Sequence, residues 1–157
     1  MLVNPKNPNA GAQLKDMQMA SFALGQEVSI VKASTTAEID EAFAVLVERR
    51  VSGLLVGADA LFSHREEQIT TLARQNKIPA IYATTIIGGL MSYGPSFIDG
   101  YHQAGIYTGR ILKSDKPADL PVQQVTKIEL IINMKVAREL GIEIPHSLLA
   151  RADQVIE

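Results

Sequence analysis

The sequence contains no cysteine and no tryptophan, and aromatic residues make up only 5% of its 157 residues. Without cysteine the chain can form no disulfide, thiolate nucleophile or thiolate metal site, but this absence does not indicate a compartment, since many exported proteins also lack cysteine. Any pocket must be lined by aliphatic side chains, tyrosines and amides.

An excess of one charge is also missing, because 15 basic and 17 acidic residues are interspersed and leave a net charge of −2. No basic stripe is available for a phosphate backbone, which argues against nucleic acid as a partner. No apolar run approaches the ~20 residues that cross a bilayer, and the first residues lack the charged-then-apolar pattern of a signal peptide. As written, the chain is expected to be cytoplasmic, with no direct membrane insertion.

Motifs of catalysis and cofactor binding are absent as well. The sequence has no dinucleotide glycine fingerprint, no phosphate loop and no nucleophile elbow. His64, His102 and His146 stand far apart, with no neighbour at metal-ligand spacing, and are interpreted as structural or solvent-facing. We therefore predict no catalytic residue, no metal site and no cofactor.

Hydrophobic residues make up 46% of the sequence, enough for a core. Strand and helix patterns alternate regularly from Met1 to Tyr82. This order predicts an α/β fold, a parallel sheet with right-handed crossovers and helices on both faces. The strand that opens at Met1 suggests a fragment cut from a longer chain. The predicted strands are 1–3, 27–33, 51–57 and 78–82, and the predicted helices are 10–24, 36–50 and one that follows Ser63.

Cap signals place the helix ends. Asn9 is a plausible N-cap and Gly25 a plausible C-terminal stop for the first helix. Thr35 with Glu38, and Ser63 with Glu66, have the spacing of a capping box.

The stretch 78–95 (IPAIYATTIIGGLMSYGP) reads as a strand, a crossing rich in glycine and a further strand ending at Pro95. Its residues suit either a hinge between two lobes or an ordinary loop between two strands of one sheet. Beyond it we predict a helix capped by Ser96, an extended connector over 115–126, a strand over 127–133, a short helix over 134–140 and a last helical turn after Pro145.

Ligands of parallel sheets bind beyond the carboxyl ends of the strands, which directs attention to the turns there. Asp59 follows the third predicted strand and has no basic neighbour. Its carboxylate could pair with a ligand ammonium group or simply shape the turn, and position alone leaves both open.

Five stretches of the sequence together form a recognisable succession, namely VNPKNPNA at 3–10, IPAIYA at 78–83, GGLMSYGP at 88–95, GRILKSDKPADLPVQQVTKIELIIN at 109–133 and LLARADQVIE at 148–157. The glycine-rich piece, the KPADLPVQQ segment and the terminal LLARAD are the specific parts. This succession resembles the substrate-binding proteins of bacterial ABC importers, related to tryptophan- and tyrosine-binding importer proteins.

The resemblance implies a type I periplasmic-binding-protein-like lobe, because such proteins are about twice as long and close two α/β lobes over a small ligand. Residues 1–83 would be the C-terminal-type lobe, 84–95 a crossing or hinge, and 96–157 a helix, connector, strand and helices returning to a missing N-terminal lobe. Relatives commonly carry a longer stretch with an Arg-Glu pair before Gly88, where this chain has only ATTII.

Site residues also follow from the resemblance. The turn of Asn7, Pro8, Asn9 and Ala10 would present backbone N–H groups and amides to a ligand carboxylate. Asp59 would receive the ligand's amine, and Ser92 and Tyr93 would add a hydroxyl and an aromatic face. Binding would be non-covalent, with an ABC permease as partner, and the location would be periplasmic if the chain derives from a longer exported parent.

Half of such a protein would leave apolar surface from Gly89 to Leu112 and on the strand 127–133. These elements could fold back onto the first strands, or two chains could exchange them, and we expect a homodimer or higher oligomer. Two alternatives to a solute-binding component stay open. One is a folded half-protein or interaction domain that binds nothing, and the other is a small α/β enzyme or cytosolic sensor using Asp59.

Overall fold

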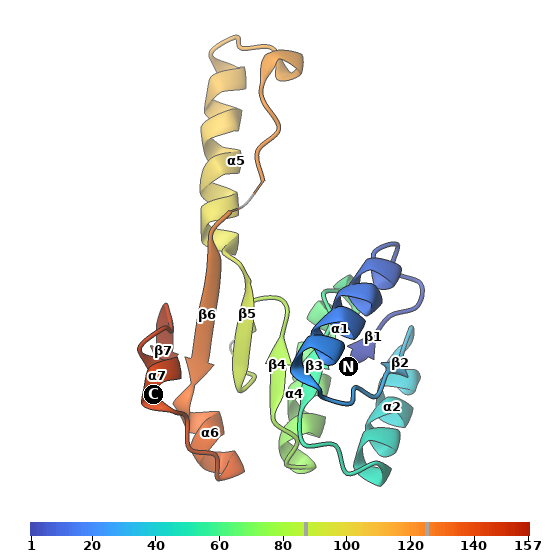
Figure 1. Ribbon diagram of the computed structural model, residues 1–157. Helices are drawn as coiled ribbons and strands as arrows, with labels where there is room; N and C mark the ends of the chain where they lie inside the picture. Colours follow the sequence, from blue (N-terminus) through green and yellow to red (C-terminus); the bar gives the residue numbers. More distant parts are fainter. Residues whose placement is uncertain (87, 125) are drawn as a thin grey trace.

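The computed structural model describes residues 1–86, 88–124 and 126–157, and its strands form one seven-stranded sheet in the order β2-β1-β3-β4-β5-β6-β7 (Figure 1). The strands are β1 (Leu2–Val3), β2 (Val31–Lys32), β3 (Leu54–Val56), β4 (Ala80–Tyr82), β5 (Met91–Pro95), β6 (Ile128–Asn133) and β7 (Gln154–Ile156). The helices are α1 (Ala10–Leu24), α2 (Thr36–Glu48), α3 (Ala60–His64), α4 (Glu66–Gln75), α5 (Phe97–Leu112), α6 (Met134–Leu140) and α7 (His146–Leu149), with a 3₁₀ turn at Pro117–Asp119.

The predicted α/β fold with a parallel sheet is confirmed from β2 to β5, where every neighbouring pair is parallel. β6 then runs antiparallel to β5, with Ser92 opposite Ile131, while β7 is parallel to β6. The reversed strand was not foreseen, because its alternating pattern gives no direction. β7 was missed because Gln154–Ile156 follows directly on the predicted last helical turn, with no turn signal to separate them. The predicted strands 27–33 and 51–57 are also shorter than expected.

The main core lies between one face of β1 to β4 and the helices α2, α3 and α4. Phe43 and Leu46 from α2 meet Phe62 and Ile69 from α3 and α4, and each is at most 2% exposed. The opposite face carries α1 and is covered less completely. On it Leu55 and Ile81 are only partly buried, and Phe22 of α1 is 91% exposed.

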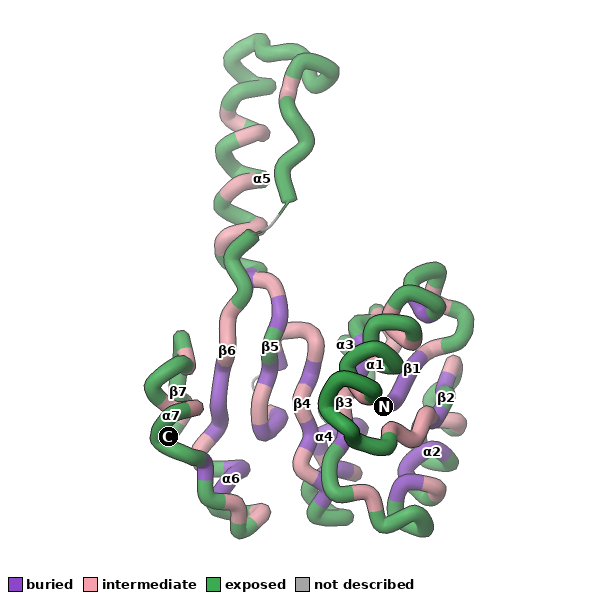
Figure 2. The backbone as a smooth tube through the Cα atoms, viewed as in Figure 1, coloured by how far each residue is buried: buried purple, intermediate pink, exposed green. Residues whose placement is uncertain are grey.

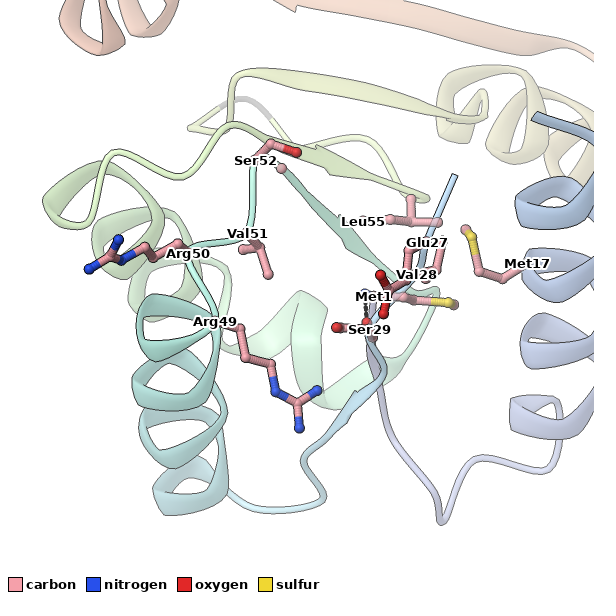
Figure 3. Close-up of a pocket in the computed structure, with 11 residues that line it drawn as sticks. Met1, Met17, Glu27, Val28, Ser29, Arg49, Arg50, Val51, Ser52 and Leu55 are labelled. Carbon is pink, nitrogen blue, oxygen red and sulfur yellow. Dashed lines mark hydrogen bonds between the residues drawn. The ribbon is translucent and has the colours of Figure 1, made fainter. Parts of the chain in front are cut away.

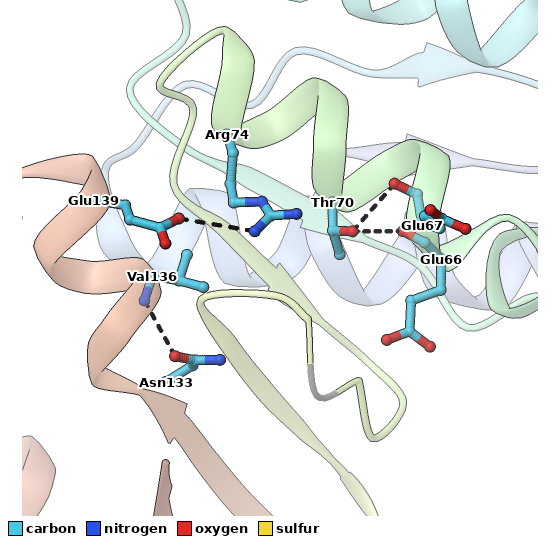
Figure 4. Close-up of polar contacts among 7 residues, drawn as sticks. All are labelled: Glu66, Glu67, Thr70, Arg74, Asn133, Val136 and Glu139. Carbon is cyan, nitrogen blue, oxygen red and sulfur yellow. Dashed lines mark hydrogen bonds and ion pairs between the residues drawn. The ribbon is translucent and has the colours of Figure 1, made fainter. Parts of the chain in front are cut away.

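A second apolar cluster joins β6 to α6 and includes Leu90, Ile132 and Val136. Polar contacts at its border connect α4 with α6 (Figure 4). Arg74 lies 3.7 Å from the Glu139 carboxylate, and the side-chain oxygen of Asn133 accepts from the Val136 N–H at 3.1 Å to cap α6. The C-terminal part of the chain is attached to the main core chiefly by the pairing of β6 with β5, because an exposed ion pair such as Arg74–Glu139 stabilises little.

The predicted cap of α2 is confirmed, since the Thr35 hydroxyl accepts a hydrogen bond from the Glu38 N–H at 3.2 Å. The Glu38 carboxylate turns back to Ser34, the residue before the cap. It accepts hydrogen bonds from the Ser34 N–H at 2.7 Å and the Ser34 hydroxyl at 3.0 Å. The Ser34 backbone hydrogen bond is the main reason that the pKa of Glu38 lies below its ordinary value of 4.5.

We predict that Glu38→Gln removes a pH-dependent part of the stability. A carboxyl group whose pKa is lower in the folded state stabilises the protein above the unfolded pKa, and this contribution is lost as the pH falls through the folded pKa. The native chain should therefore be more stable than Glu38→Gln at neutral pH, and the difference should shrink below pH 4.5. Urea titrations of both proteins at several pH values measure this difference, and a difference that does not vary with pH contradicts the assignment.

The predicted capping box of Ser63 and Glu66 is wrong. The chain forms two helices here, and the cap of the first is Asp59, whose carboxylate accepts from the Leu61 N–H at 2.9 Å. The Ser63 hydroxyl instead donates to the Asp59 carbonyl oxygen at 3.2 Å. Asp59 lies four residues before Ser63 and starts α3 earlier than expected, so Ser63 falls inside this helix and does not cap α4.

Between β4 and β5 the chain makes a connection within one sheet, which is the second of the two alternatives from the sequence. Tyr82 pairs with Ser92 in parallel register. The backbone of Gly94 lies so close to β4 that a Cβ atom there would sit 2.5 Å from the Ala83 carbonyl oxygen. A role of this segment as a hinge stays a prediction, and Ile87, which belongs to it, lies outside the described residues.

α5 and the connector after it extend away from the sheet as an arm (Figure 1). The predicted cap is present, because the Ser96 hydroxyl accepts from the Asp99 N–H at 3.4 Å, yet no residue of α5 is buried (Figure 2). The connector runs back beside the helix, where the Tyr107 hydroxyl donates to the Pro121 carbonyl oxygen at 2.6 Å. Val125 of the connector lies outside the described residues.

Candidate functional site

Two turns at the carboxyl edge of the sheet are joined by a network of side-chain hydrogen bonds centred on Asp59. The turn from β1 to α1 contributes Asn4 and Asn7, and the turn from β3 to α3 contributes Ala58 and Asp59. β1 and β3 are neighbours in the sheet, so residues 55 positions apart in the sequence meet here.

The Asp59 carboxylate accepts hydrogen bonds from both asparagines. Asn4 Nδ2 donates to Asp59 Oδ1 at 3.0 Å, and Asn7 Nδ2 donates to Asp59 Oδ2 at 2.7 Å. The Asp59 Oδ1 atom also accepts a hydrogen bond from the Leu61 N–H. The carboxylate therefore shapes the turn, which is one of the two roles considered for it. Because each carboxylate oxygen can accept about two hydrogen bonds, the half-buried group keeps capacity for a further donor.

Two members of this network were not singled out from the sequence. Asn4 directly follows β1, and Gln13 lies in the first turn of α1, where its Nε2 donates to the Ala58 carbonyl oxygen at 3.0 Å. Asn4 directly before a proline is a recognisable turn signal. Gln13 carries no such signal, because a glutamine in a helix is most often solvated.

The turn 7–10 is built by Asn7. Its side-chain oxygen accepts from the Asn9 N–H at 2.8 Å, and its carbonyl oxygen accepts from the Ala10 N–H at 2.9 Å. Asn9 precedes α1 as expected but makes no side-chain cap, and Pro8 is exposed and carries no N–H. The N–H groups of Asn9 and Ala10 already have acceptors. Helix geometry gives the N–H groups of the next two residues, the exposed Gly11 and Ala12, no intrahelical acceptor.

Ser92 and Tyr93 lie on β5, two strands away from β3. Alternation along the strand turns them to opposite faces. Ser92 is 1% exposed and its hydroxyl has no hydrogen-bond partner among the described residues, whereas Tyr93 is 58% exposed. At about 4.8 Å between strands, β5 lies about 10 Å from β3, so the structure does not bring Ser92 and Tyr93 into the hydrogen-bond network around Asp59.

A cavity of about 680 Å³ lies at the other end of the sheet (Figure 3). It is lined by residues that precede the strands, including Ser29 before β2 and Ser52 before β3, together with Arg49 at the end of α2. Ligands of parallel sheets bind at the carboxyl ends of the strands, so this amino-end cavity is not the preferred site.

Other kinds of site find no support in the part of the chain that the structure describes. Within residues 1–86, 88–124 and 126–157, no group of three or more metal-ligating side chains lies together. The three histidines are exposed in three separate helices, as the sequence predicted. Among the same residues, no helix combines the length and the hydrophobicity that a membrane span requires.

Comparison with known proteins gives matches over nearly the whole chain. Residues 1–156 match the family model described as ABC transporter substrate binding protein. No curated protein matches the chain. Among solved structures, a conserved domain protein from Vibrio cholerae superposes with a TM-score of 0.84 at 26% identity, covering 98% of this chain and 53% of the other.

Two further structures are similar. An ABC domain from Streptococcus pneumonia, described as a complex with L-Trp, superposes with a TM-score of 0.84 at 28% identity and covers 99% of this chain and 53% of its own. A ligand-free, open substrate-binding protein with adhesive properties from Clostridium difficile has a TM-score of 0.69 at 23% identity, with coverage of 99% and 52%. This chain thus spans about half the length of the structures it resembles.

Proposed function

Because this chain belongs to the family of ABC transporter substrate-binding proteins, we propose that it is the C-terminal lobe of a solute-binding component and contributes one side of a site for an amino-acid-like solute. The observation that carries the proposal is the half-buried Asp59 carboxylate, held by Asn4 and Asn7 at the carboxyl edge of the sheet. The proposal involves binding only and assigns no chemical reaction.

The edge offers complementary groups to the two charges of an α-amino acid. The Asp59 carboxylate suits an ammonium group, and the N-terminal turn of α1 suits a carboxylate through its N–H groups and the positive end of the helix dipole. Asn7 connects the Asp59 carboxylate with the N-terminal turn of α1. Its side-chain NH2 donates to Asp59, and its side-chain oxygen accepts from the Asn9 N–H in the turn before α1. Tyr93 would add an aromatic surface, while Ser92 would need a movement of β5 to reach a ligand, because it is buried.

Half of a two-lobed site should bind weakly. A closed pocket buries about 70–90% of a small ligand, and a single lobe leaves much of that surface in water. We expect dissociation constants in the millimolar range, which corresponds to about −4 kcal/mol.

The wider role follows from the family. The complete protein would act outside the cytoplasm, deliver its solute to an ABC permease and close its two lobes around it, with residues 84–95 as the hinge. For the 157-residue chain alone we propose a homodimer, since the arm leaves apolar side chains exposed.

One observation favours the alternative function, a lobe that folds and binds no solute. The Asp59 carboxylate already accepts hydrogen bonds from three donors within the chain.

A thermal-shift screen with millimolar free amino acids separates these two functions. A ligand that prefers the folded state raises the unfolding temperature as its concentration exceeds Kd. Asp59→Asn keeps an oxygen able to cap α3 but replaces the other oxygen with an NH2 group that cannot accept from Asn7. We therefore expect a lower unfolding temperature without ligand and, because the charge is lost, a Kd raised at least tenfold. Asp16→Asn, an equal change of charge on an exposed residue of α1, is the matched control. Equal binding by all three proteins would remove Asp59 from the site.

A further inference from the structure

Tyr82 carries a hydroxyl group that the fold buries and that lies outside the proposed solute site. The residue ends β4 and is 1% exposed. Its hydroxyl has no hydrogen-bond partner among the described residues. Buried polar side-chain atoms nearly always have a partner, either in the protein or in an ordered water molecule. The Tyr82 hydroxyl therefore points to a ligand of its own.

The protonation state of Tyr82 indicates what this ligand has to offer. Burial, and after it the charge of the Glu66 carboxylate, raise the pKa of Tyr82 above its ordinary value of 10.0. The hydroxyl is therefore neutral near neutral pH, and a neutral phenol group donates one hydrogen bond and can accept another. A small neutral molecule that both donates and accepts hydrogen bonds matches it.

A small cavity adjoins the Tyr82 side chain. Its volume is about 10 Å³, and it is lined by residues of β4, α4, α6 and the turn at Gly88 and Gly89. A cavity of about 10–15 Å³ has room for one water molecule. The volume thus selects water and leaves no room for a larger ligand.

Gly89 holds the Tyr82 ring beside this cavity. A Cβ atom added at Gly89 would overlap the Cε2 and Cδ2 atoms of the ring. Because glycine has no side chain, the ring can lie directly against the backbone of the turn. The position of the ring in turn fixes the position of the hydroxyl at its end.

Two polar side chains of α4 also border the cavity and keep capacity for further hydrogen bonds. Thr70 is 4% exposed, and its hydroxyl donates to the Glu66 carbonyl oxygen at 2.9 Å, so the Thr70 oxygen can still accept. Arg74 follows one turn later on the same side of α4 (Figure 4). Its ion pair with Glu139 leaves further N–H donors. A buried water needs about two to four polar partners, and Tyr82, Thr70 and Arg74 supply them.

We propose that this cavity binds one ordered water molecule that bridges the Tyr82 hydroxyl and Thr70. The water accepts a hydrogen bond from the Tyr82 O–H and donates one to Thr70 Oγ1. This bridge joins β4 to α4 behind the turn that leads into β5, the segment with the proposed hinge role. The water site does not depend on solute binding.

A crystal structure of the purified chain, at a resolution that shows ordered water, tests the proposal directly. We expect a water oxygen at about 2.5–3.0 Å from both Tyr82 Oη and Thr70 Oγ1. A cavity without density, or a Tyr82 hydroxyl that bonds the Glu66 carboxylate directly, overturns the proposal.

Tyr82→Phe gives a second readout, because the sign of its effect depends on the water. Loss of one net hydrogen bond should reduce the equilibrium constant for folding about fivefold in urea denaturation. A buried hydroxyl without any partner would give the opposite sign, since its removal is favourable. Tyr101→Phe, the same change on a residue that is 77% exposed, should leave the stability unchanged. A Tyr82→Phe chain as stable as the native chain, or more stable, contradicts the water site.

Thr70→Val tests the other end of the bridge. The substitution removes the Thr70 hydroxyl at nearly the same volume and loses its bond to Glu66 in every background. If one water joins Thr70 to Tyr82, Thr70→Val should reduce the folding constant less in the Tyr82→Phe chain than in the native chain. In the Tyr101→Phe chain its effect should equal that in the native chain. Additive effects of Thr70→Val and Tyr82→Phe would show that no water connects the two residues.

Discussion

Phe43→Ala is expected to lower the free energy of unfolding by about 3–5 kcal/mol, the range for removing a buried phenylalanine. Phe43 is 2% exposed and lies in the main core with Leu46 and Ile69. The substitution removes apolar contacts and leaves a cavity between α2 and the sheet. Since small domains have about 5–15 kcal/mol of total stability, much of the stability of this chain should be lost.

Urea denaturation followed by far-UV circular dichroism measures this loss. Phe22→Ala is the matched control, because Phe22 is 91% exposed on α1 and the same change there should stay within about 0.5 kcal/mol. Phe43→Leu, which refills most of the volume, keeps the comparison informative if Phe43→Ala does not fold. Equal losses for the two alanine variants would contradict the position of the core on the α2 face.

Gly94→Ala is expected to cost about 2–3 kcal/mol, at the upper end for overpacking. The new Cβ would lie 2.5 Å from the Ala83 carbonyl oxygen, 3.0 Å from the Ala83 carbonyl carbon and 3.2 Å from the Thr84 Cα. All three are backbone atoms at the end of β4 and cannot rotate away as a side chain does. β5 would have to move away from β4 and disturb the pairing of Tyr82 with Ser92.

Gly11→Ala is the control for this substitution, because a Cβ at Gly11 meets nothing within 4 Å and alanine favours a helix. It should be neutral or stabilising by up to about 1 kcal/mol. If Gly94→Ala were as harmless as Gly11→Ala, β5 would not lie against β4 as described.

Local signals in the sequence predicted most helices of this fold, although α3 was missed. α1 runs from Ala10 to Leu24 and ends at Gly25 in the left-handed conformation, as expected, and Thr35 and Ser96 cap their helices. Each of these features depends on a few neighbouring residues, so a pattern in the sequence suffices to indicate it.

Features that depend on distant contacts were harder to predict. The antiparallel direction of β6 is fixed by pairing with β5, more than 30 residues earlier. Asp59 starts α3 before the cap expected at Ser63, and its carboxylate also bonds Asn4 and Asn7 in another turn, a contact that the local pattern does not reveal. Of the site residues taken from the resemblance, Asn7 and Asp59 are in direct contact. Ser92 is buried on β5, two strands away from β3, and does not reach them.

The most direct test of the account is a heteronuclear NMR titration of the 17.0 kDa chain with L-tryptophan, followed by the other free amino acids. NMR detects millimolar binding and locates it residue by residue. The account predicts shifts for a bound amino acid confined to residues 4–12, 58–61 and the vicinity of Tyr93, and absent in Asp59→Asn. Shifts at the amino-end cavity around Arg49 and Ser52, or no shift with any amino acid, would contradict it.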